Sequence, residues 1–174
     1  ALGIGNGDEV ITTPFTFAAT SNVIIQRNAH PIFVDIEPDT FNLDPKKIEA
    51  VITEKTKAIV VVPMWSAPRM DELINIGEKY DLPIIEDAAQ SIGAKYKNIP
   101  AGSFGKIGCF SAHPLKNLNA LGDAGFITTN SKKIAVTPIS PFRPRRWKGR
   151  ILSASSLIKI YDDHNKPVSY THLR

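Results

Sequence analysis

The sequence contains one cysteine, Cys109, and no apolar run long enough to cross a membrane. A single cysteine excludes an internal disulfide and is typical of a reducing compartment, so we expect a cytoplasmic protein. A transmembrane helix needs roughly 20 apolar residues, so the sequence predicts no membrane partner. Residues 1–8 lack the basic segment that opens a signal peptide. They also lack an initiating methionine and are loop-forming, which predicts that the chain is a fragment of a longer protein.

Acidic residues are scarce toward the C-terminus. Residues 1–123 contain 11 Lys/Arg and 15 Asp/Glu, a net charge of −4, whereas residues 124–174 contain 10 and 2, a net charge of +8. The basic character therefore belongs to the end of the chain. A nucleic-acid-binding patch is one interpretation of this segment. A solvated or non-native basic segment is favoured, because no recognition motif accompanies the basic residues Arg143, Arg145, Arg146, Lys148 and Arg150. We expect no nucleic-acid partner.

Strand and helix patterns alternate along the first three quarters of the chain. Short β-branched or apolar runs predict strands, and amphipathic stretches predict helices. Asp44 followed by Pro45 is a helix start, with an N-cap and a proline at the first helical position. This alternation predicts an α/β fold, a mostly parallel sheet with flanking helices. The expected strands are residues 9–13, 31–36, 58–62, 83–85, 107–111 and 125–129, and the expected helices are residues 16–28, 45–52 and 70–80.

Asp87 and Lys116 are the residues that point to chemistry. Asp87 follows the apolar run at residues 82–85, and the carboxyl ends of such strands are where open α/β sheets bind ligands. A helix N-cap is the alternative for Asp87, and a surface lysine is the alternative for Lys116. The neighbours of Lys116 favour a pocket, since Ser111 and Asn117 are short hydrogen-bonding residues and small residues follow. An acid that holds a pyridinium nitrogen and a lysine that forms a Schiff base are what a protein supplies to pyridoxal phosphate (PLP).

Five segments along the chain carry a resemblance to a known family. They are residues 5–20, 33–38, 86–90, 102–105 and 109–118 with the nearby pair 122–123, in this order and spacing. Over residues 1 to about 134 the chain resembles the DegT–StrS family of PLP-dependent sugar aminotransferases. The resemblance implies that the chain is part of the large domain of a type I PLP-dependent transferase.

The resemblance also implies roles for individual residues. Lys116 matches the lysine that forms the Schiff base and acts as the catalytic base and acid. Asp87 matches the carboxylate on the ring nitrogen, and Gln90 the residue beside the ring oxygen of the cofactor. Ser111 matches a phosphate contact, and Phe17 falls where an aromatic ring lies against the cofactor face. Asn117, next to the lysine, is assigned to the same cofactor site. His113 lies in the same loop, where a structural and a substrate-side role both stay open. No metal is expected.

The implied reaction transfers an amino group from an amino acid, glutamate by expectation, to a keto sugar linked to a nucleotide. Such reactions belong to polysaccharide or antibiotic sugar biosynthesis. The full-length protein is expected to be a homodimer, and this fragment to be inactive by itself. Three alternatives are a PLP-dependent sugar dehydratase, a regulatory member of the same fold, and a non-functional truncated product. Family dehydratases carry histidine at the position of Lys116, so the lysine favours transamination.

The sequence divides into two parts. Residues 1–136 are predicted to be a partial PLP-binding large domain. Residues 137–174 are predicted to be a tail foreign to the family, disordered or out of frame, because residues 137–144 include three prolines that prevent a regular helix or central strand. A short helix is possible at residues 151–161. The segment at residues 63–70 is also about three residues shorter than the corresponding family loop.

Overall fold

A computed structural model describes residues 1–64, 69–120 and 124–135, and the strand residues 152–153, 160–161 and 167–168. Over these residues the main element is a seven-stranded sheet in the order β2-β1-β3-β4-β7-β8-β9. Its strands are β1 (Glu9–Thr12), β2 (His30–Phe33), β3 (Thr56–Val61), β4 (Ile84–Asp87), β7 (Ile107–Ser111), β8 (Gly125–Thr129) and β9 (Leu152–Ser153). Neighbouring strands from β2 to β7 are parallel, β8 is antiparallel to β7, and β9 is parallel to β8.

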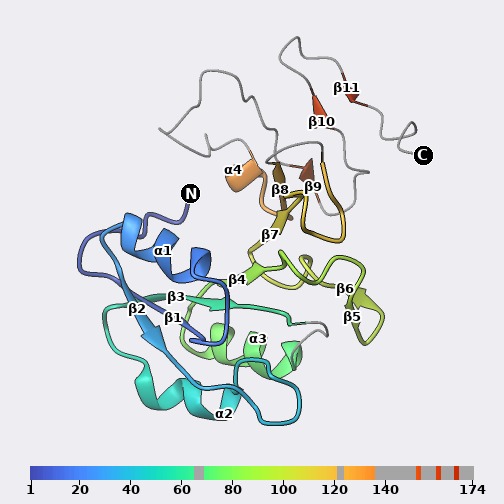
Figure 1. Ribbon diagram of the computed structural model, residues 1–174. Coiled ribbons are helices and arrows are strands. Elements are labelled where there is room, and N and C mark those ends of the chain that lie inside the picture. The colour runs from blue at the N-terminus through green and yellow to red at the C-terminus, as the bar shows by residue number, and fades with distance from the viewer. Residues whose placement is uncertain (65–68, 121–123, 136–151, 154–159, 162–166, 169–174) are drawn as a thin grey trace.

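The helices lie on both faces of the sheet (Figure 1). Helix α1 (Ala19–Gln26) covers one face, and α2 (Pro45–Ile48) and α3 (Met70–Lys79) cover the other. A 3-10 turn, η1 (Glu49–Val51), follows α2, and α4 (Lys132–Ala135) follows β8. The Asp44 side chain accepts a hydrogen bond from the Lys46 backbone N–H at 3.0 Å, so the predicted N-cap of α2 is present.

The alternation of side chains in β3 explains why the sheet has two cores. Successive residues of a strand point to opposite faces. Ala58 and Val60 pack in the cluster with Ile24 of α1, whereas Ile59 and Val61 pack in the larger cluster with Leu73 of α3. A strand covered on both faces must be apolar at nearly every position, and this is the pattern of residues 58–62.

The predicted fold class is confirmed, with differences at element ends. Helix α1 begins at Ala19 rather than residue 16 and ends at Gln26, because Asn28 has a φ of 57°, which lies in the left-handed region. Strand β4 extends to Asp87, two residues beyond the expected strand. A hairpin of β5 (Lys95–Tyr96) and β6 (Ile99–Pro100) was not predicted from the sequence.

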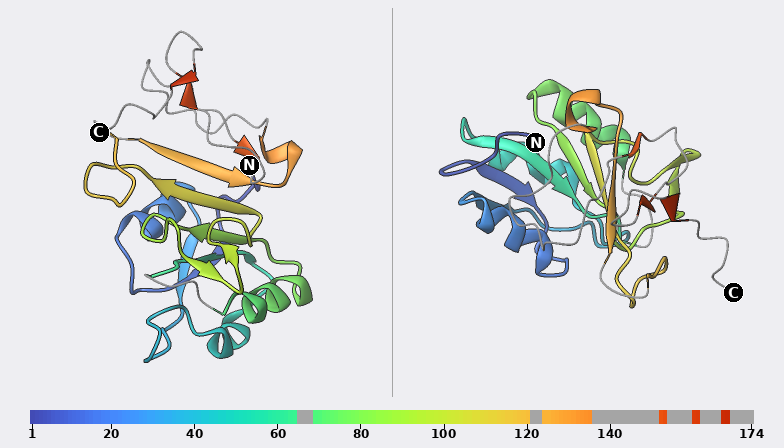
Figure 2. Two further views of the ribbon diagram at one scale, coloured as in Figure 1. Left: turned by 90° about the vertical axis from the view of Figure 1, so that its right-hand side faces the viewer. Right: turned by 90° about the horizontal axis from the view of Figure 1, so that it is seen from above.

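The C-terminal segment lies largely outside the described residues. The helix considered for residues 151–161 is wrong at its four described residues, because Leu152–Ser153 and Ile160–Tyr161 are strands. Ile160–Tyr161 (β10) pairs with β11 (Pro167–Val168). Figure 2 shows β8 beside β7 at the edge of the sheet that β9 joins. Within the part of the chain that the structure describes, no helix is both long and apolar enough to cross a membrane.

Candidate functional site

A pocket of about 620 Å³ lies at the carboxyl ends of four neighbouring parallel strands. Each of β1, β3, β4 and β7 ends at this edge of the sheet, and the residues at or just after each end line the pocket. Residues far apart in the sequence therefore meet there. The lining residues are Thr16, Phe17, Ala19, Val62, Met64, Asp87, Ala89, Gln90, Cys109, Phe110, Ser111, His113, Leu115 and Lys116.

Asp87 is the last residue of β4, and its carboxylate is held by α1. Alternation along β4 turns Asp87 toward the face that α1 covers. The Thr20 hydroxyl donates to Asp87 Oδ2 at 2.7 Å, and the Ala89 N–H makes a longer contact of 3.3 Å with Oδ1. Thr20 is buried and lies 2.8 Å, between hydroxyl oxygens, from Thr16. A partly buried carboxylate thus has a defined orientation and keeps acceptor capacity on Oδ1.

Glu86 precedes Asp87 and points to the opposite face. Its side chain is completely buried and accepts backbone hydrogen bonds from Gly102 at 2.6 Å, Phe104 at 2.8 Å and Gly105 at 2.7 Å. Burial raises the pKa of Glu86, and these three hydrogen bonds oppose that change. Glu86 therefore attaches the loop at residues 102–105 to the strand that carries Asp87.

The loop at residues 102–105 can approach Glu86 because it contains two glycines. Gly102 has a φ of +83°, and a side chain there would collide with the ring of Phe110. A Cβ at Gly105 would lie 2.6 Å from the carbonyl oxygen of Ile84, which is shorter than any normal contact. Glycine at both positions therefore allows the backbone N–H groups to reach the buried carboxylate.

Lys116 lies in a loop that follows β7 and is closed at its base. The Ala120 N–H donates to the Ala112 carbonyl at 2.9 Å, and the Lys116 N–H donates to the His113 carbonyl at 2.8 Å. The ring Nδ1 of His113 accepts from the Leu115 N–H at 3.2 Å. These bonds define the turn that brings Lys116 to the pocket, which supports a structural role for His113.

Ser111 and Phe17 present suitable groups to a ligand. The Ser111 hydroxyl oxygen accepts from the His113 N–H at 3.2 Å, so its proton can be donated to a bound anion. The Phe17 side chain is 75% exposed at the pocket, where its ring offers a flat apolar surface. Cys109 is paired with Asp87 across β4 and β7, and burial, followed by the charges of Asp87 and Glu86, raises the pKa of its thiol to about 11.

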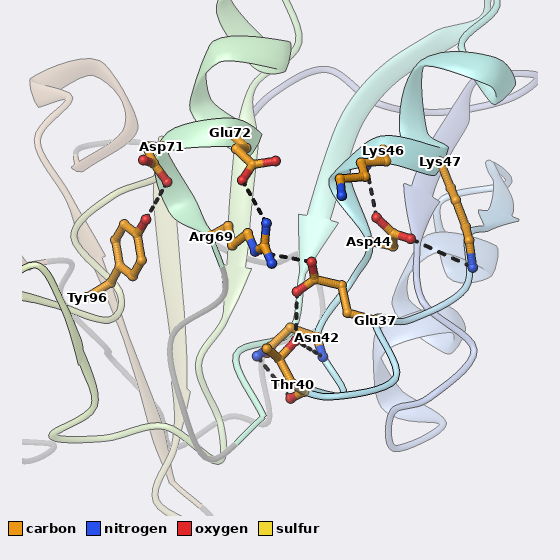
Figure 3. A network of polar contacts seen from close by, with 10 residues as sticks. All are labelled: Glu37, Thr40, Asn42, Asp44, Lys46, Lys47, Arg69, Asp71, Glu72 and Tyr96. Carbon is orange, nitrogen blue, oxygen red and sulfur yellow. Dashed lines mark hydrogen bonds and ion pairs between the residues drawn. The ribbon is translucent and has the colours of Figure 1, made fainter.

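A polar network supports the pocket wall that follows β3 (Figure 3). Asn42 is buried, and its side-chain oxygen accepts from the backbone N–H of Met64, a lining residue, at 3.0 Å. Arg69 pairs with the buried Glu37 at 3.2 Å, and the Thr40 hydroxyl donates to Glu37 at 2.8 Å. Met64 and Arg69, near the two ends of the short segment at residues 63–70, are thereby attached to the same turn at residues 37–42. Residues 65–68 lie outside the described part.

Six of the seven site residues predicted from the sequence line this pocket. Asn117 is exposed and is not among the lining residues. Sequence reasoning missed Thr16, Thr20 and Cys109. Thr16 lies before the start of α1, so its contact with Thr20 depends on the bend that precedes the helix. The other predicted residues, which meet here, are Phe17, Asp87, Gln90, Ser111, His113 and Lys116. In the described residues, no group of three or more His, Cys, Asp or Glu could hold a metal ion.

The fold and the site define an aminotransferase-type α/β domain. The model of the DegT/DnrJ/EryC1/StrS aminotransferase family matches residues 1–140, and the chain belongs to this family. The resemblance predicted from the sequence is therefore confirmed.

Two curated relatives and one solved structure illustrate the similarity. The chain is 49% identical over 136 residues to the pleiotropic regulatory protein of Geobacillus stearothermophilus, covering 78% of this chain and 37% of the relative. It is 46% identical over 136 residues to the UDP-2-acetamido-2-deoxy-3-oxo-D-glucuronate aminotransferase of Pseudomonas aeruginosa, covering 78% of this chain and 38% of that enzyme. The crystal structure of NtdA from Bacillus subtilis with bound cofactor PMP matches with a TM-score of 0.71 and 38% identity, covering 76% of this chain and 30% of that one. The chain thus spans about a third of the length of the proteins it matches.

Proposed function

We propose that residues 1–136 are the cofactor-binding part of a PLP-dependent aminotransferase that acts on a keto sugar linked to a nucleotide. The observation that carries this proposal is the presence of both residues in one pocket, Asp87 at the end of β4 and Lys116 in the loop after the adjacent strand β7. The similarity to an aminotransferase of a UDP-linked keto sugar supports the substrate class. Below, the complete enzyme means the protein in which this segment is continued by the remaining segments of a family chain.

The residues present fit PLP or its amine form, PMP. The ring nitrogen needs a carboxylate, and Asp87 lines the pocket with acceptor capacity on Oδ1. The phosphate needs a hydrogen-bond donor, which Ser111 supplies, and the ring face needs an apolar partner, which Phe17 supplies. Gln90 is assigned to the ring oxygen. Asn117, outside the lining, is assigned to the cofactor site only through its position next to Lys116.

The bound cofactor supplies an electron sink for the carbon that loses a proton. Lys116 Nζ holds the cofactor covalently before the amino donor arrives and, once free, accepts the proton from the α-carbon of the donor. Asp87 keeps the ring nitrogen protonated through a charge-assisted hydrogen bond. Val62 and Met64 contribute apolar side chains to the wall of the same pocket.

We also propose glutamate as the amino donor, a homodimer as the assembly of the complete enzyme, and the cytoplasm as its location. A regulatory role is a second candidate, because one relative is named a pleiotropic regulatory protein. Conversion of bound PLP to PMP on addition of glutamate distinguishes an aminotransferase from a regulatory protein. Absence of this conversion in an enzyme that binds PLP would favour the regulatory candidate or a dehydratase.

The test of the proposal is to find the lysine that binds PLP. The complete enzyme is incubated with PLP, reduced with borohydride and digested, and the peptides are mapped by mass spectrometry. The pyridoxyl group is expected on Lys116, and Lys116→Ala is expected to abolish both labelling and turnover. Lys106→Ala is the matched control, because Lys106 is an exposed lysine before β7 that does not line the pocket. Label on a different lysine in the wild-type protein would refute the assignment.

We propose further that residues 137–174 are not part of the family domain. The family match ends at residue 140, which supports this boundary. The competing observation is the pairing of β9 with β8. Truncation of the chain after Val136 is expected to leave the urea midpoint of unfolding unchanged. A lower midpoint would make β9 a genuine strand of the sheet.

A further inference from the structure

Three polar side chains form a continuous hydrogen-bonded chain from the pocket into α1 and back to β4. The Thr16 and Thr20 hydroxyl oxygens are 2.8 Å apart, and Thr20 donates to Asp87 Oδ2 at 2.7 Å. Thr16 lines the pocket, Thr20 is buried, and Asp87 lines the pocket again. The residues at the two ends of this chain are 71 positions apart in the sequence, so only the tertiary fold assembles it.

The direction of these hydrogen bonds follows from the chemistry of the groups. An ionised carboxylate has no proton to give, so Thr20 must be the donor to Asp87. A hydroxyl has a single proton, so Thr20 can only accept from Thr16. Thr16 in turn donates its hydroxyl proton to Thr20, so it can only accept a hydrogen bond from a ligand in the pocket. The charge of Asp87 therefore fixes the orientation of both hydroxyl groups.

We propose that Thr20 is a positioning residue for Asp87. By donating to Oδ2, the Thr20 hydroxyl fixes the rotation of the carboxylate and directs Oδ1 to the ligand. The hydrogen bond from Thr16 to Thr20 strengthens the bond from Thr20 to Asp87. This inference rests on the proposed function, because it assigns the purpose of the chain to recognition of a protonated ring nitrogen. Its consequence is specific: Thr20 contributes to binding of a ligand with a ring nitrogen and contributes little to a ligand without one.

The experiment compares two probes in the complete enzyme. One is PLP, and the other is its analogue with carbon in place of the ring nitrogen. Dissociation constants for both are measured by equilibrium dialysis, and their ratio is the nitrogen preference. Thr20→Val keeps the shape of the side chain but removes the hydroxyl group. We expect it to lower the nitrogen preference by about tenfold, the value of one hydrogen bond to a charged group. Thr20→Ser keeps the hydroxyl and is expected to retain the preference.

Two further variants complete the design. Thr16→Val is expected to lower the preference by about threefold, since it weakens the chain without breaking the bond to Asp87. It also tests the proposal if Thr20→Val does not fold. Thr53→Val is the matched control, because it removes a 2.5 Å hydroxyl–carboxylate bond to Glu9, and neither residue lines the pocket. This control is expected to leave the preference unchanged.

The outcomes separate this inference from the proposed function. Equal weakening of both probes by Thr20→Val would make Thr20 merely structural and overturn the inference, while the proposed function stands. A wild-type enzyme with no nitrogen preference would overturn the assignment of Asp87 and the inference with it. A wild-type enzyme that is not labelled at Lys116 would overturn the proposed function itself.

Discussion

Replacement of Glu86 should be the most destabilising change near the site that leaves the pocket lining intact. In Glu86→Ala, the backbone N–H groups of Gly102, Phe104 and Gly105 lose their acceptor. An unsatisfied buried donor costs about 1–3 kcal/mol. Because Phe104 and Gly105 are only partly buried, water can reach two of the three donors. We therefore expect about 2 kcal/mol from the buried Gly102 donor and about 1 kcal/mol from each of the other two, a loss of about 4 kcal/mol in the free energy of unfolding.

Glu86→Gln provides a finer test of the same geometry. One glutamine oxygen can still accept from Phe104 and Gly105, but the amide NH₂ then faces the Gly102 N–H, donor against donor. The expected loss is about 2 kcal/mol, half of the value for alanine. Glu78→Gln is the control, because Glu78 is an exposed carboxylate on α3 and its replacement should cost less than about 0.5 kcal/mol.

Urea unfolding of the 174-residue chain, followed by circular dichroism, measures these losses. The pH adds a second readout, because burial raises the pKa of Glu86 above its usual value of 4.5. A raised pKa in the folded state means that the part of the stability that depends on protonation of Glu86 is complete below pH 4.5 and is lost as the pH rises through the folded value. Glu86→Gln should remove this part of the pH dependence. A loss of less than about 1 kcal/mol in Glu86→Ala would refute the proposed anchoring.

Three other predictions concern single residues. Asp87→Asn in the complete enzyme should lower turnover by orders of magnitude. A change below about tenfold, or 1.4 kcal/mol of barrier, would make Asp87 only a structural acceptor for Thr20 and Ala89. Asp71, whose pKa is lowered to about 2 by Lys97 and then Tyr96, should stabilise the hairpin fully above pH 3.8 and lose this effect as the pH falls through 2. Asp71→Asn should therefore flatten the acid limb of a stability–pH curve, and an unchanged limb would contradict this. The Cys109 thiol, whose pKa is raised from 9.0 to about 11, should react with a maleimide about a hundredfold more slowly than a free thiol. Because Cys109 lines the pocket, bound PLP should slow this reaction further. A reaction rate that PLP leaves unchanged would contradict the position of Cys109 in the pocket.

The main strands could be predicted from the sequence because their signals are local. Residues 107–111 and 125–129 coincide with β7 and β8, since each is a short run of apolar or β-branched residues between small residues. The hairpin of β5 and β6 was missed because each strand has two residues. Its turn depends on Lys97 and Asn98, with φ values of 47° and 66°, and lysine gives no local indication of a left-handed conformation.

The site was predictable where the chain itself carries the chemistry. Asp87 and Lys116 are recognisable from their flanking residues, and both line the pocket. The bond from Thr20 to Asp87 joins residues 67 positions apart, and no local pattern indicates it. It exists because alternation along β4 turns Asp87 toward the face that α1 covers. Contacts of this kind follow from the topology of the sheet and cannot be deduced from residue spacing.

The strand order implies a route by which the sheet can be built during synthesis. After β1, β2 and β3 have paired, each later strand, β4, β7 and then β8, adds to the same free edge. Chain segments that leave the ribosome first can fold first, so the walls of the pocket can form in the order Thr16, Met64, Asp87 and Lys116. The lysine completes the pocket last, and a nascent chain shorter than β7 has no amine in place to retain a cofactor.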